Sequence, residues 1–574
     1  MYKIAVCDHI HQKGLDMLSS QNDIEMFDFS DLPKDELFAR LKDVDVAITR
    51  SSTSVDQKFL QSVQNLKAVV RAGVGVDNVD IDGCSKQGIV VMNVPTANTI
   101  AAVELTMTHI LSAIRNFPGA NTQLKDERKW KREDWYGTEL KGKKLGVIGF
   151  GNIGSRVGIR CKAFEMEVLA YDPYIQPSKA TNLGITYVKN FSDILACDII
   201  TIHTPKSAET KNMITKKEIA QMKDGVILIN CARGGLYNED DLYEGLKSKK
   251  IRWAGIDVFD KEPGTSNKLL DLPNIYVTPH IGANTLESQE QIAKEATQAA
   301  MEAARGIAYP NALNLPATQA NTPDFVQPYT ELIQKLGYFC SKVDKSAITS
   351  IKIHTEGEIS KYVDLLKIFA IVGVLKPSLD NKINYINAPF IAQERGIQIH
   401  TNTQDSSNSY KNLVSITFNT NEGSLSVAGT VFDDNIIRLS QFDEFEVLVE
   451  PKGRMILFKN TDVPGVIGSV GQILGKHSIN ISDFRLARNN RGEALALVLI
   501  DDDVPQKVID ELRDIPACLW SCYVVNSCAS AKGSKKLRFS HSRARQMRNI
   551  WILELLYHKL TLLRRKTLFQ PHRM

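Results

Sequence analysis

The first 95 residues alternate short apolar runs with stretches in which apolar residues recur at helical spacing. The apolar runs have the length of buried strands: 3–8, 24–29, 44–49 and 66–73. The stretches between them have helical patterns: 11–20, 34–41 and 55–63. Because strands that alternate with amphipathic helices form parallel sheets covered on both faces, this segment predicts an α/β layer.

A second alternation of the same kind follows a long apolar-rich helix pattern at 99–114. Its strand patterns lie at 144–150, 167–172, 198–203, 225–232, 253–259 and 275–280. The predicted fold class is therefore α/β, with two doubly wound parallel-sheet domains of Rossmann or flavodoxin-like type.

The pattern changes after the helix predicted at 286–306, which is long enough to cross from one domain to the other. A stretch rich in Pro and Asn, 309–325, indicates a boundary. Residues 325–450 mix helix and strand patterns, and 454–526 read as a small module of strands and helix. We expect two further α+β domains here.

A glycine-spaced turn follows the strand pattern "KLGVIGF". In Gly149-Phe-Gly151-Asn152-Ile153-Gly154 the first glycine permits a tight turn, the second lets backbone approach a pyrophosphate, and the third lets helix pack on strand. The helix N-terminus would then direct unpaired N–H groups at the phosphates. The next strand pattern ends in Asp172, whose carboxylate can bind ribose hydroxyls and repel a 2′-phosphate, so NAD is favoured over NADP. Alternatively, Asp172 only begins the "DPY" turn.

Three polar residues follow successive strand patterns of the second domain: Arg233 in "INCARGG", Glu262 in "DVFDKEP" and His280 in "TPHIGANT". Ligands bind at the carboxyl ends of the strands in open α/β sheets. Oxidation of a 2-hydroxy acid needs a base matched to neutral pH, a carboxylate to orient it and an arginine to hold the substrate carboxylate. Each residue alone is typical of a structural role, so the prediction rests on the combination.

Charge and composition exclude some classes of function. The sequence has no run of about 18 apolar residues and no basic-then-apolar start, so we expect neither a membrane span nor a secretory signal. Nine scattered cysteines, without a C-x-x-C pair, indicate reduced thiols, no metal site and a cytoplasmic protein. Residues 529–574 hold 12 Lys or Arg and one acidic residue, so this tail carries +11 and the rest of the chain −7.

The ordered motifs "GFGNIG", "HTP", "NCARGG", "GIDVFDKEP" and "PHIGANT" resemble those of the D-isomer-specific 2-hydroxyacid dehydrogenases. The resemblance implies that His280 is the acid/base, Glu262 its partner and Arg233 the carboxylate-binding residue near the nicotinamide. It also implies that Asp257 and the backbone of Cys231 bind the carboxamide and that Thr204 lines the cofactor cleft.

In this family the nucleotide domain is inserted into the substrate domain. The resemblance therefore implies a substrate domain formed by 1–97 and 289–318, with an NAD-binding domain at 98–288 between them. "RAGVGVDNVD" and "NVPTANT" are similar to the branch that oxidises 3-phospho-D-glycerate to 3-phosphohydroxypyruvate, the first step of L-serine biosynthesis. We expect the substrate side to be supplied by six residues, with the arginines facing the phosphate: Arg50, Ser51, Arg71, Val74, Gly75 and Asn98.

The C-terminal half resembles the long form of that branch. Residues 325–450 are similar to its intervening domain, which is like an allosteric substrate-binding domain, and 453–526 to an ACT domain, an amino-acid-binding βαββαβ module. This implies feedback by L-serine, with Asp462 near the effector amine and Asn480 contributed by a neighbouring ACT domain. Such paired sites imply a homo-oligomer, a tetramer by this resemblance. Alternatively, the ACT domain only joins subunits.

Other functions remain open from sequence. A glyoxylate- or D-lactate-type dehydrogenase would share the motifs, but such enzymes usually end near residue 320. An NAD-sensing corepressor-like protein uses the same fold as a binding module, yet lacks the last two domains. The basic tail, 527–574, could bind nucleic acid or a membrane surface. We favour a disordered or accidental extension, with neither partner, because the acidic body lacks a basic face.

Overall fold

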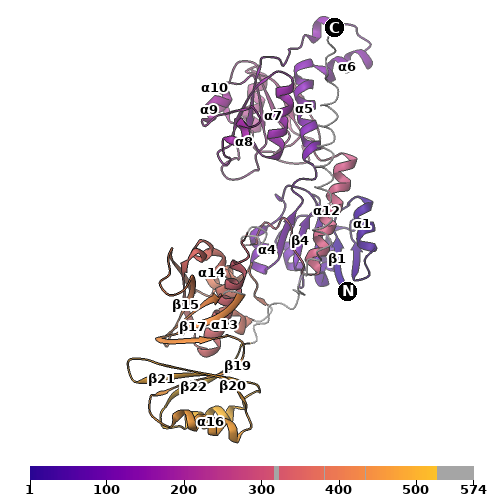
Figure 1. The fold of residues 1–574 in the computed structure, drawn as a ribbon. Helices are drawn as coiled ribbons and strands as arrows, with labels where there is room; N and C mark the ends of the chain where they lie inside the picture. Colours follow the sequence, from indigo (N-terminus) through magenta and orange to yellow (C-terminus); the bar gives the residue numbers. More distant parts are fainter. Residues whose placement is uncertain (316–321, 380–381, 433–434, 527–574) are drawn as a thin grey trace, which may run out of the picture. The chain divides into compact units, whose positions relative to one another are not determined.

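The computed structural model describes residues 1–315, 322–379, 382–432 and 435–526. They form two compact units (Figure 1). The first unit consists of the described residues up to 322 together with 382–396, and the second comprises the rest of the described chain. The basic tail discussed above lies outside the described residues. Among the described helices, none is long and apolar enough to cross a bilayer.

The first sheet of unit one has five parallel strands in the order β2-β1-β3-β4-β5. They are β1 (Tyr2–Val6), β2 (Ile24–Asp28), β3 (Val46–Thr49), β4 (Ala68–Arg71) and β5 (Val90–Asn93). Four helices follow the strands: α1 (Gln12–Ser19), α2 (Lys34–Arg40), α3 (Gln57–Ser62) and α4 (Ile81–Gln87). Strands β3 and β5 are buried along their whole length, which is why they read as continuous apolar runs.

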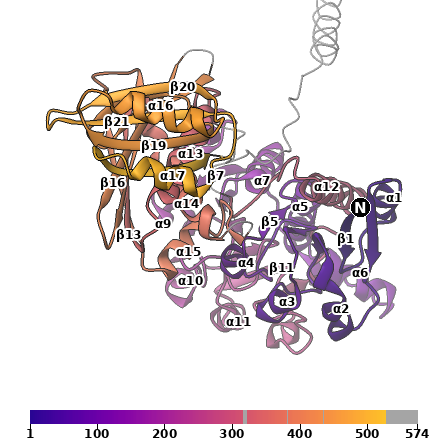
Figure 2. The same cartoon turned by 90° about the horizontal axis from the view of Figure 1, so that it is seen from below.

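A helix from far along the chain completes this layer. Helix α12 (Leu286–Ala304) packs against β1, β3 and β4 and lies beside α1 in both views (Figures 1 and 2). Its buried face is a row of alanines, including Ala293, Ala296 and Ala300. Such small side chains let a helix approach a sheet closely, so the chain leaves this layer near residue 95 and returns to it at α12.

The second sheet has seven parallel strands in the order β12-β11-β10-β9-β6-β7-β8. They are β6 (Lys144–Ile148), β7 (Glu167–Tyr171), β8 (Thr186–Tyr187), β9 (Ile199–Ile202), β10 (Val226–Asn230), β11 (Ile251–Ile256) and β12 (Ile275–Val277). Helices α5 (Thr99–Arg115) and α7 (Asn152–Ala163) pack on one another. The strand order reverses between β6 and β9, and this switch point is where open α/β sheets bind ligands.

Shorter elements connect and cover the second sheet. They are α6 (Phe117–Lys125), α8 (Ser178–Thr181), α9 (Phe191–Leu195), α10 (Lys216–Gln221) and α11 (Glu239–Lys247). Four aromatic or aliphatic side chains between 117 and 136 are exposed, three of them by two thirds or more: Phe117, Leu124, Trp130 and Tyr136.

The second unit begins with a six-stranded mixed sheet in the order β14-β13-β15-β16-β17-β18. Its strands are β13 (Ile348–Gly357), β14 (Gln398–Gln404), β15 (Asn412–Thr420), β16 (Ser424–Phe432), β17 (Ile436–Phe442) and β18 (Phe445–Val449). Only β13 and β14 pair in parallel. Helices α13 (Val326–Val343) and α14 (Val363–Leu379) pack together over this sheet.

An antiparallel four-stranded sheet ends the described chain. Its elements are β19 (Gly453–Thr461), α16 (Val466–Lys476), β20 (Ile481–Arg488), β21 (Glu493–Ile500), α17 (Gln506–Arg513) and β22 (Cys518–Asn526). The strand order β20-β21-β19-β22 is that of a ferredoxin-like βαββαβ module. The predicted fold class, two parallel sheets followed by two α+β domains, is confirmed.

One short segment packs away from its neighbours in sequence. Residues 382–396, including α15 (Ala388–Glu394), belong to the first unit, although sequence similarity groups them with the mixed-sheet region. Asn384 Nδ2 donates to the Gly88 carbonyl over 2.9 Å, and Ile386 joins the apolar core of the first sheet. Two asparagines close the turn before α15 by exchanging hydrogen bonds, which lets this polar loop lie against α4.

Candidate active site

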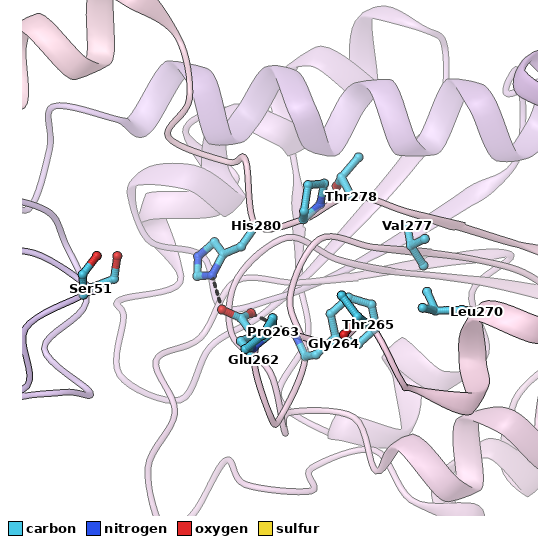
Figure 3. Close-up of a pocket in the computed structure, with 12 residues that line it drawn as sticks. Ser51, Glu262, Pro263, Gly264, Thr265, Leu270, Val277, Thr278 and His280 are labelled. Carbon is cyan, nitrogen blue, oxygen red and sulfur yellow. Dashed lines mark hydrogen bonds and ion pairs between the residues drawn. The ribbon is translucent and has the colours of Figure 1, made fainter. Parts of the chain in front are cut away.

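A histidine and a glutamate face each other beyond the ends of β11 and β12. His280 Nδ1 lies 2.9 Å from Glu262 Oε2, and Glu262 Oε1 accepts from the Phe259 amide over 3.1 Å. Figure 3 shows the two side chains directed at one another, with Ser51 opposite them on a loop of the first sheet. Because Nδ1 is used by Glu262, the other ring nitrogen, Nε2, is the atom available for proton transfer.

The pair raises the basicity of the imidazole. The hydrogen bond that His280 donates to Glu262 raises the pKa of His280 above its ordinary value, while burial acts in the opposite direction. Burial raises the pKa of Glu262, but the hydrogen bonds from His280 and from the Phe259 amide outweigh it, so this pKa is lowered overall. The two shifts agree in describing a carboxylate that stabilises the protonated imidazole.

Asp257 fixes the loop that carries His280. Its carboxylate accepts hydrogen bonds from the Thr278 hydroxyl at 2.6 Å and from the amides of Ile281 and Gly282 at 2.8 and 2.9 Å. Its carbonyl accepts from the His280 amide at 2.9 Å. His280 has φ +53°, a left-handed conformation that non-glycine residues rarely adopt and that a surrounding network must hold.

This network extends to a buried histidine on α5. His109 Nε2 lies 3.1 Å from the Thr278 hydroxyl oxygen. Because that hydroxyl donates its proton to Asp257, His109 must donate a proton from Nε2 to the hydroxyl oxygen. In the neutral ring, Nδ1 then carries no proton. Burial lowers the pKa of His109 to about 4, which is consistent with a neutral ring at physiological pH.

Arg233 lies in the loop after β10. Its Nε donates to Asp77 Oδ2 over 3.0 Å, and its Nη1 donates to the Ala232 carbonyl over 2.7 Å. Its Nη2 occupies space beside Gly75: a Cβ added there would lie 2.2 Å from it. Gly75 is therefore needed for the close approach of the guanidinium to the loop after β4.

All predicted catalytic and substrate-side residues border one cavity of about 430 Å³. Its wall brings together residues from the carboxyl ends of β3, β4, β5, β10, β11 and β12 and from the loops that follow them. The lining includes Arg50, Ser51, Arg71, Val74, Gly75, Asn98, Arg233, Glu262 and His280.

Three arginines, Arg50, Arg71 and Arg233, border this cavity together with two carboxylates, Asp77 and Glu262, so the arginines are in excess. Burial lowers the pKa of Arg71 to about 10, and repulsion by Arg50 and Arg233 acts in the same direction. Burial also lowers the pKa of Arg50. Arg71 Nε is buried without a hydrogen-bond partner in the described chain. A buried cation with an unsatisfied donor beside two like charges indicates a site built for an anion.

Sequence patterns gave no role to Asp8, at the carboxyl end of β1. This side chain is 4% exposed. Its oxygens accept from the amides of Arg50 and Thr53 at 2.5 and 3.1 Å, from the Thr53 hydroxyl at 2.6 Å and from Lys34 Nζ at 3.1 Å. Asp8 therefore shapes the loop that presents Arg50 and Ser51. Only its position directly after an apolar strand could have drawn attention to it.

A second cavity, of about 500 Å³, also borders the histidine and glutamate pair (Figure 3). Apolar side chains, among them Phe259, Pro263, Leu270 and Val277, form much of its wall. It shares Ser51, Glu262 and His280 with the first cavity. The histidine and glutamate pair therefore borders both a cavity lined by charged side chains and a largely apolar one.

The glycine turn before α7 fits a dinucleotide. Gly149 has φ +82°, and a Cβ there would meet the His203 carbonyl at 2.8 Å. A Cβ at Gly154 would lie 2.0 Å from the Gly149 carbonyl oxygen, whereas the space around Gly151 is open. The Thr204 hydroxyl next to this turn is buried without a partner in the described chain. An open glycine at a helix N-terminus, beside an orphaned hydroxyl, fits the NAD pyrophosphate and its neighbours.

The remaining cofactor candidates lie around the same turn. Asp172 accepts from the amides of Phe150 at 2.9 Å and Tyr174 at 3.0 Å, so its carboxylate supports both the glycine turn and the "DPY" turn. Asn152 and Ile153 form the first turn of α7. The Cys231 side chain is buried and its thiol pKa is raised by burial, so only its backbone is suited to a cofactor contact.

The two effector candidates lie in the C-terminal module. Asp462 pairs with Arg488 on β20 at 3.0 Å. Asn480 Nδ2 donates to Asp501 over 2.6 Å. The structure therefore gives both side chains partners within their own domain. Within the described residues, no group of three or more His, Cys, Asp or Glu side chains could hold a metal ion.

Three regions of the chain match models of known protein families. Residues 107–282 match the NAD-binding domain of D-isomer specific 2-hydroxyacid dehydrogenases, 325–443 the intervening domain of D-3-phosphoglycerate dehydrogenase, and 454–517 the ACT domain. The Methanocaldococcus jannaschii D-3-phosphoglycerate dehydrogenase is 37% identical over 519 residues, covering 90% of this chain and 98% of its own. The Bacillus subtilis enzyme of that name is 35% identical with the same coverage.

Solved structures resemble the first unit. A Thermus thermophilus protein, TT0316, is 30% identical with a TM-score of 0.50 and covers 54% of this chain and 99% of its own. A glyoxylate reductase from Paecilomyes thermophila is 26% identical with the same TM-score and covers 54% and 98%. Relatives of the shorter type thus match about half of the chain, whereas the two long relatives match nine tenths of it.

Proposed function

Because the chain belongs to the D-3-phosphoglycerate dehydrogenases of the D-isomer-specific 2-hydroxyacid dehydrogenase family, it is an NAD-dependent oxidoreductase of L-serine biosynthesis, and we propose roles for the residues of its cleft. Arg233 holds the C1 carboxylate of 3-phospho-D-glycerate. His280 Nε2 takes the proton from the C2 hydroxyl as the C2 hydride departs. Glu262 stabilises the imidazolium that results.

NAD, when bound, accepts the hydride and so supplies the oxidising chemistry. Its pyrophosphate would lie on the turn Gly149–Gly154, its ribose hydroxyls at Asp172, and its carboxamide near the backbone of Cys231 and the Asp257 loop. Thr204 would line the cleft beside it. The chain's own contribution is to orient the acid, exclude water and move one proton at His280.

The observation that carries this proposal is the convergence of three arginines and His280 on one cavity. The substrate brings a carboxylate and a phosphate, which match the positive charge of Arg233, Arg50 and Arg71. Ser51, Asn98 and the backbone at Val74 and Gly75 add hydrogen-bonding groups to the same wall. A glyoxylate- or lactate-type acid has no group for Arg50 and Arg71 to bind.

The pH dependence tests the role of Glu262. Oxidation needs neutral His280, so kcat/KM for 3-phospho-D-glycerate should rise as pH passes upward through the pKa that Glu262 raises. In Glu262→Gln that pKa falls, and the rise should occur at lower pH. Reduction of 3-phosphohydroxypyruvate needs the imidazolium, so kcat/KM for reduction should fall as the pH rises through the same pKa. In Glu262→Gln this fall should also occur at lower pH.

Profiles of kcat/KM in both directions, for wild type and Glu262→Gln, make this measurement. Glu287→Gln, an exposed change in the first turn of α12, is the matched control. A profile that stays in place after Glu262→Gln would contradict the assignment, whatever the loss of rate.

Feedback by L-serine is the regulation that the ACT domain supports. We propose that Asp462 pairs with the effector amine and that Asn480 of a neighbouring copy binds the same ligand. Since Asp462 is already paired with Arg488, the effector must replace this arginine. Coupling then requires that serine favours one domain arrangement over another.

Inhibition by L-serine should be weakened at least about tenfold in Asp462→Ala, because a charge-assisted contact to the amine is lost. Initial rates against serine concentration measure it, with the exposed Asp502→Ala as control. A wild-type enzyme that serine leaves uninhibited would show that these domains only join subunits.

Subunit association and location are proposed on separate grounds. The exposed aromatic side chains between 117 and 136, and an effector site shared by two ACT domains, support a homo-oligomer, which we take to be a tetramer. The eight cysteines in the described chain are all free, which supports a cytoplasmic enzyme.

A further inference from the structure

Arg233 is already bound to a carboxylate of the enzyme itself. Asp77, in the loop after β4, accepts a hydrogen bond from Arg233 Nε over 3.0 Å. Both residues border the cavity of about 430 Å³ that is also lined by Arg50 and Arg71, which we call the arginine cavity. The Asp77 side chain is 55% exposed and that of Arg233 26%. The ion pair is thus accessible to solvent and to an incoming anion.

The hydrogen bonds of Arg233 determine where a substrate carboxylate can bind. A carboxylate pairs best with two parallel N–H groups of a guanidinium. Nη1 donates to the Ala232 carbonyl, and Nη2 has no partner in the described chain. The Nε and Nη2 edge is therefore the face that offers two donors, and Asp77 holds one end of it.

We propose that Asp77 is a placeholder for the substrate carboxylate. Asp77 orients Arg233 to receive that carboxylate, and the carboxylate displaces Asp77 from Arg233 when the substrate binds. Asp77 acts through Arg233 and is therefore a positioning residue. While no substrate is bound, the Asp77 carboxylate supplies negative charge to the cavity. This charge offsets the repulsion between the three arginines. Because substrate binding breaks the ion pair between Asp77 and Arg233, the cost of breaking it weakens substrate binding. The same cost favours release of the product, which carries the same charge.

Asp77→Asn tests the proposal, because it keeps the shape and removes the charge. Binding of 3-phospho-D-glycerate is measured by calorimetry on the enzyme saturated with NADH, where no turnover occurs. Loss of a half-exposed ion pair should lower Kd by roughly three- to fivefold. KM should fall with it, while kcat stays the same or decreases because release is slower.

Two variants control for charge and position. Asp77→Glu restores the carboxylate and should return Kd to near the wild-type value. Asp82→Asn makes the same charge change at an exposed position in α4 and should leave Kd unchanged. A Kd for Asp77→Asn that equals or exceeds the wild-type Kd overturns the proposal, since Asp77 would then stay on Arg233 in the complex.

The proposal rests on the carboxylate-binding role of Arg233, which Arg233→Ala tests separately. This variant should weaken binding strongly, and adding Asp77→Asn to it should change nothing further. If Arg233→Ala leaves Kd unchanged, the role of Arg233 fails. If Arg233→Ala weakens binding but Asp77→Asn alone does not tighten binding, only the proposed placeholder role of Asp77 is refuted.

Discussion

Replacing His280 with asparagine is expected to lower kcat for oxidation of 3-phospho-D-glycerate by about a thousandfold. General acid–base groups contribute about 10²–10⁴-fold, and no other imidazole of the described residues borders the charged cavity. Asparagine can still hydrogen-bond to Glu262 but does not accept a proton near neutral pH. Stopped-flow formation of NADH measures the chemical step directly.

Binding of NADH, followed by fluorescence, should change little in His280→Asn, because the glycine turn and its helix are untouched. His400→Asn, an exposed change in the mixed-sheet domain, is the control for a histidine lost elsewhere. A loss of less than tenfold in His280→Asn would mean that the proton leaves by another route.

Replacing Arg71 with methionine should lower kcat/KM for 3-phospho-D-glycerate by about 10²–10³-fold. Truncating one partner of a buried charge pair costs about 2–5 kcal/mol. The same change should lower kcat/KM for D-glycerate by only a few fold, because that acid has no phosphate. The KM for NAD should stay the same.

Stability separates a binding defect from a folding defect in Arg71→Met. Burial and the two neighbouring arginines disfavour the charge of Arg71 in the empty enzyme. Removing it should therefore leave Tm unchanged or raise it. Arg71→Lys keeps the charge without the planar fork and should recover part of the lost activity. Equal losses for both acids would contradict phosphate recognition at this position.

The proposed catalytic residues could be predicted to lie together because each follows an apolar strand. Arg233, Glu262 and His280 lie after neighbouring strands of one parallel sheet, so the fold itself brings them to one edge. The glycine spacing was equally informative, since its steric demands are local: a Cβ at Gly154 would lie 2.0 Å from the carbonyl oxygen of Gly149, five residues before it in the chain. Local patterns suffice where the physical requirement is local.

Residues that act through long-range partners left no such pattern. Asp8 meets the loop at Thr53, 45 positions away, and Asp77 meets Arg233 across 156 positions. Asp257 stays a predicted contact of the cofactor, and the structure shows a second role that the sequence did not predict: both its carboxylate oxygens accept hydrogen bonds from the loop of His280. Nothing in the sequence around Asp77 distinguishes it from a solvated turn residue.

Selection of a phosphorylated 2-hydroxy acid by the arginine cavity is the property on which the proposed function depends. It is tested most directly by the initial rate of NADH formation from NAD by the purified protein, with 3-phospho-D-glycerate and D-glycerate at matched concentrations. We predict a strong preference for the phosphorylated acid. Equal turnover of the two acids, or turnover of D-glycerate alone, would contradict the account.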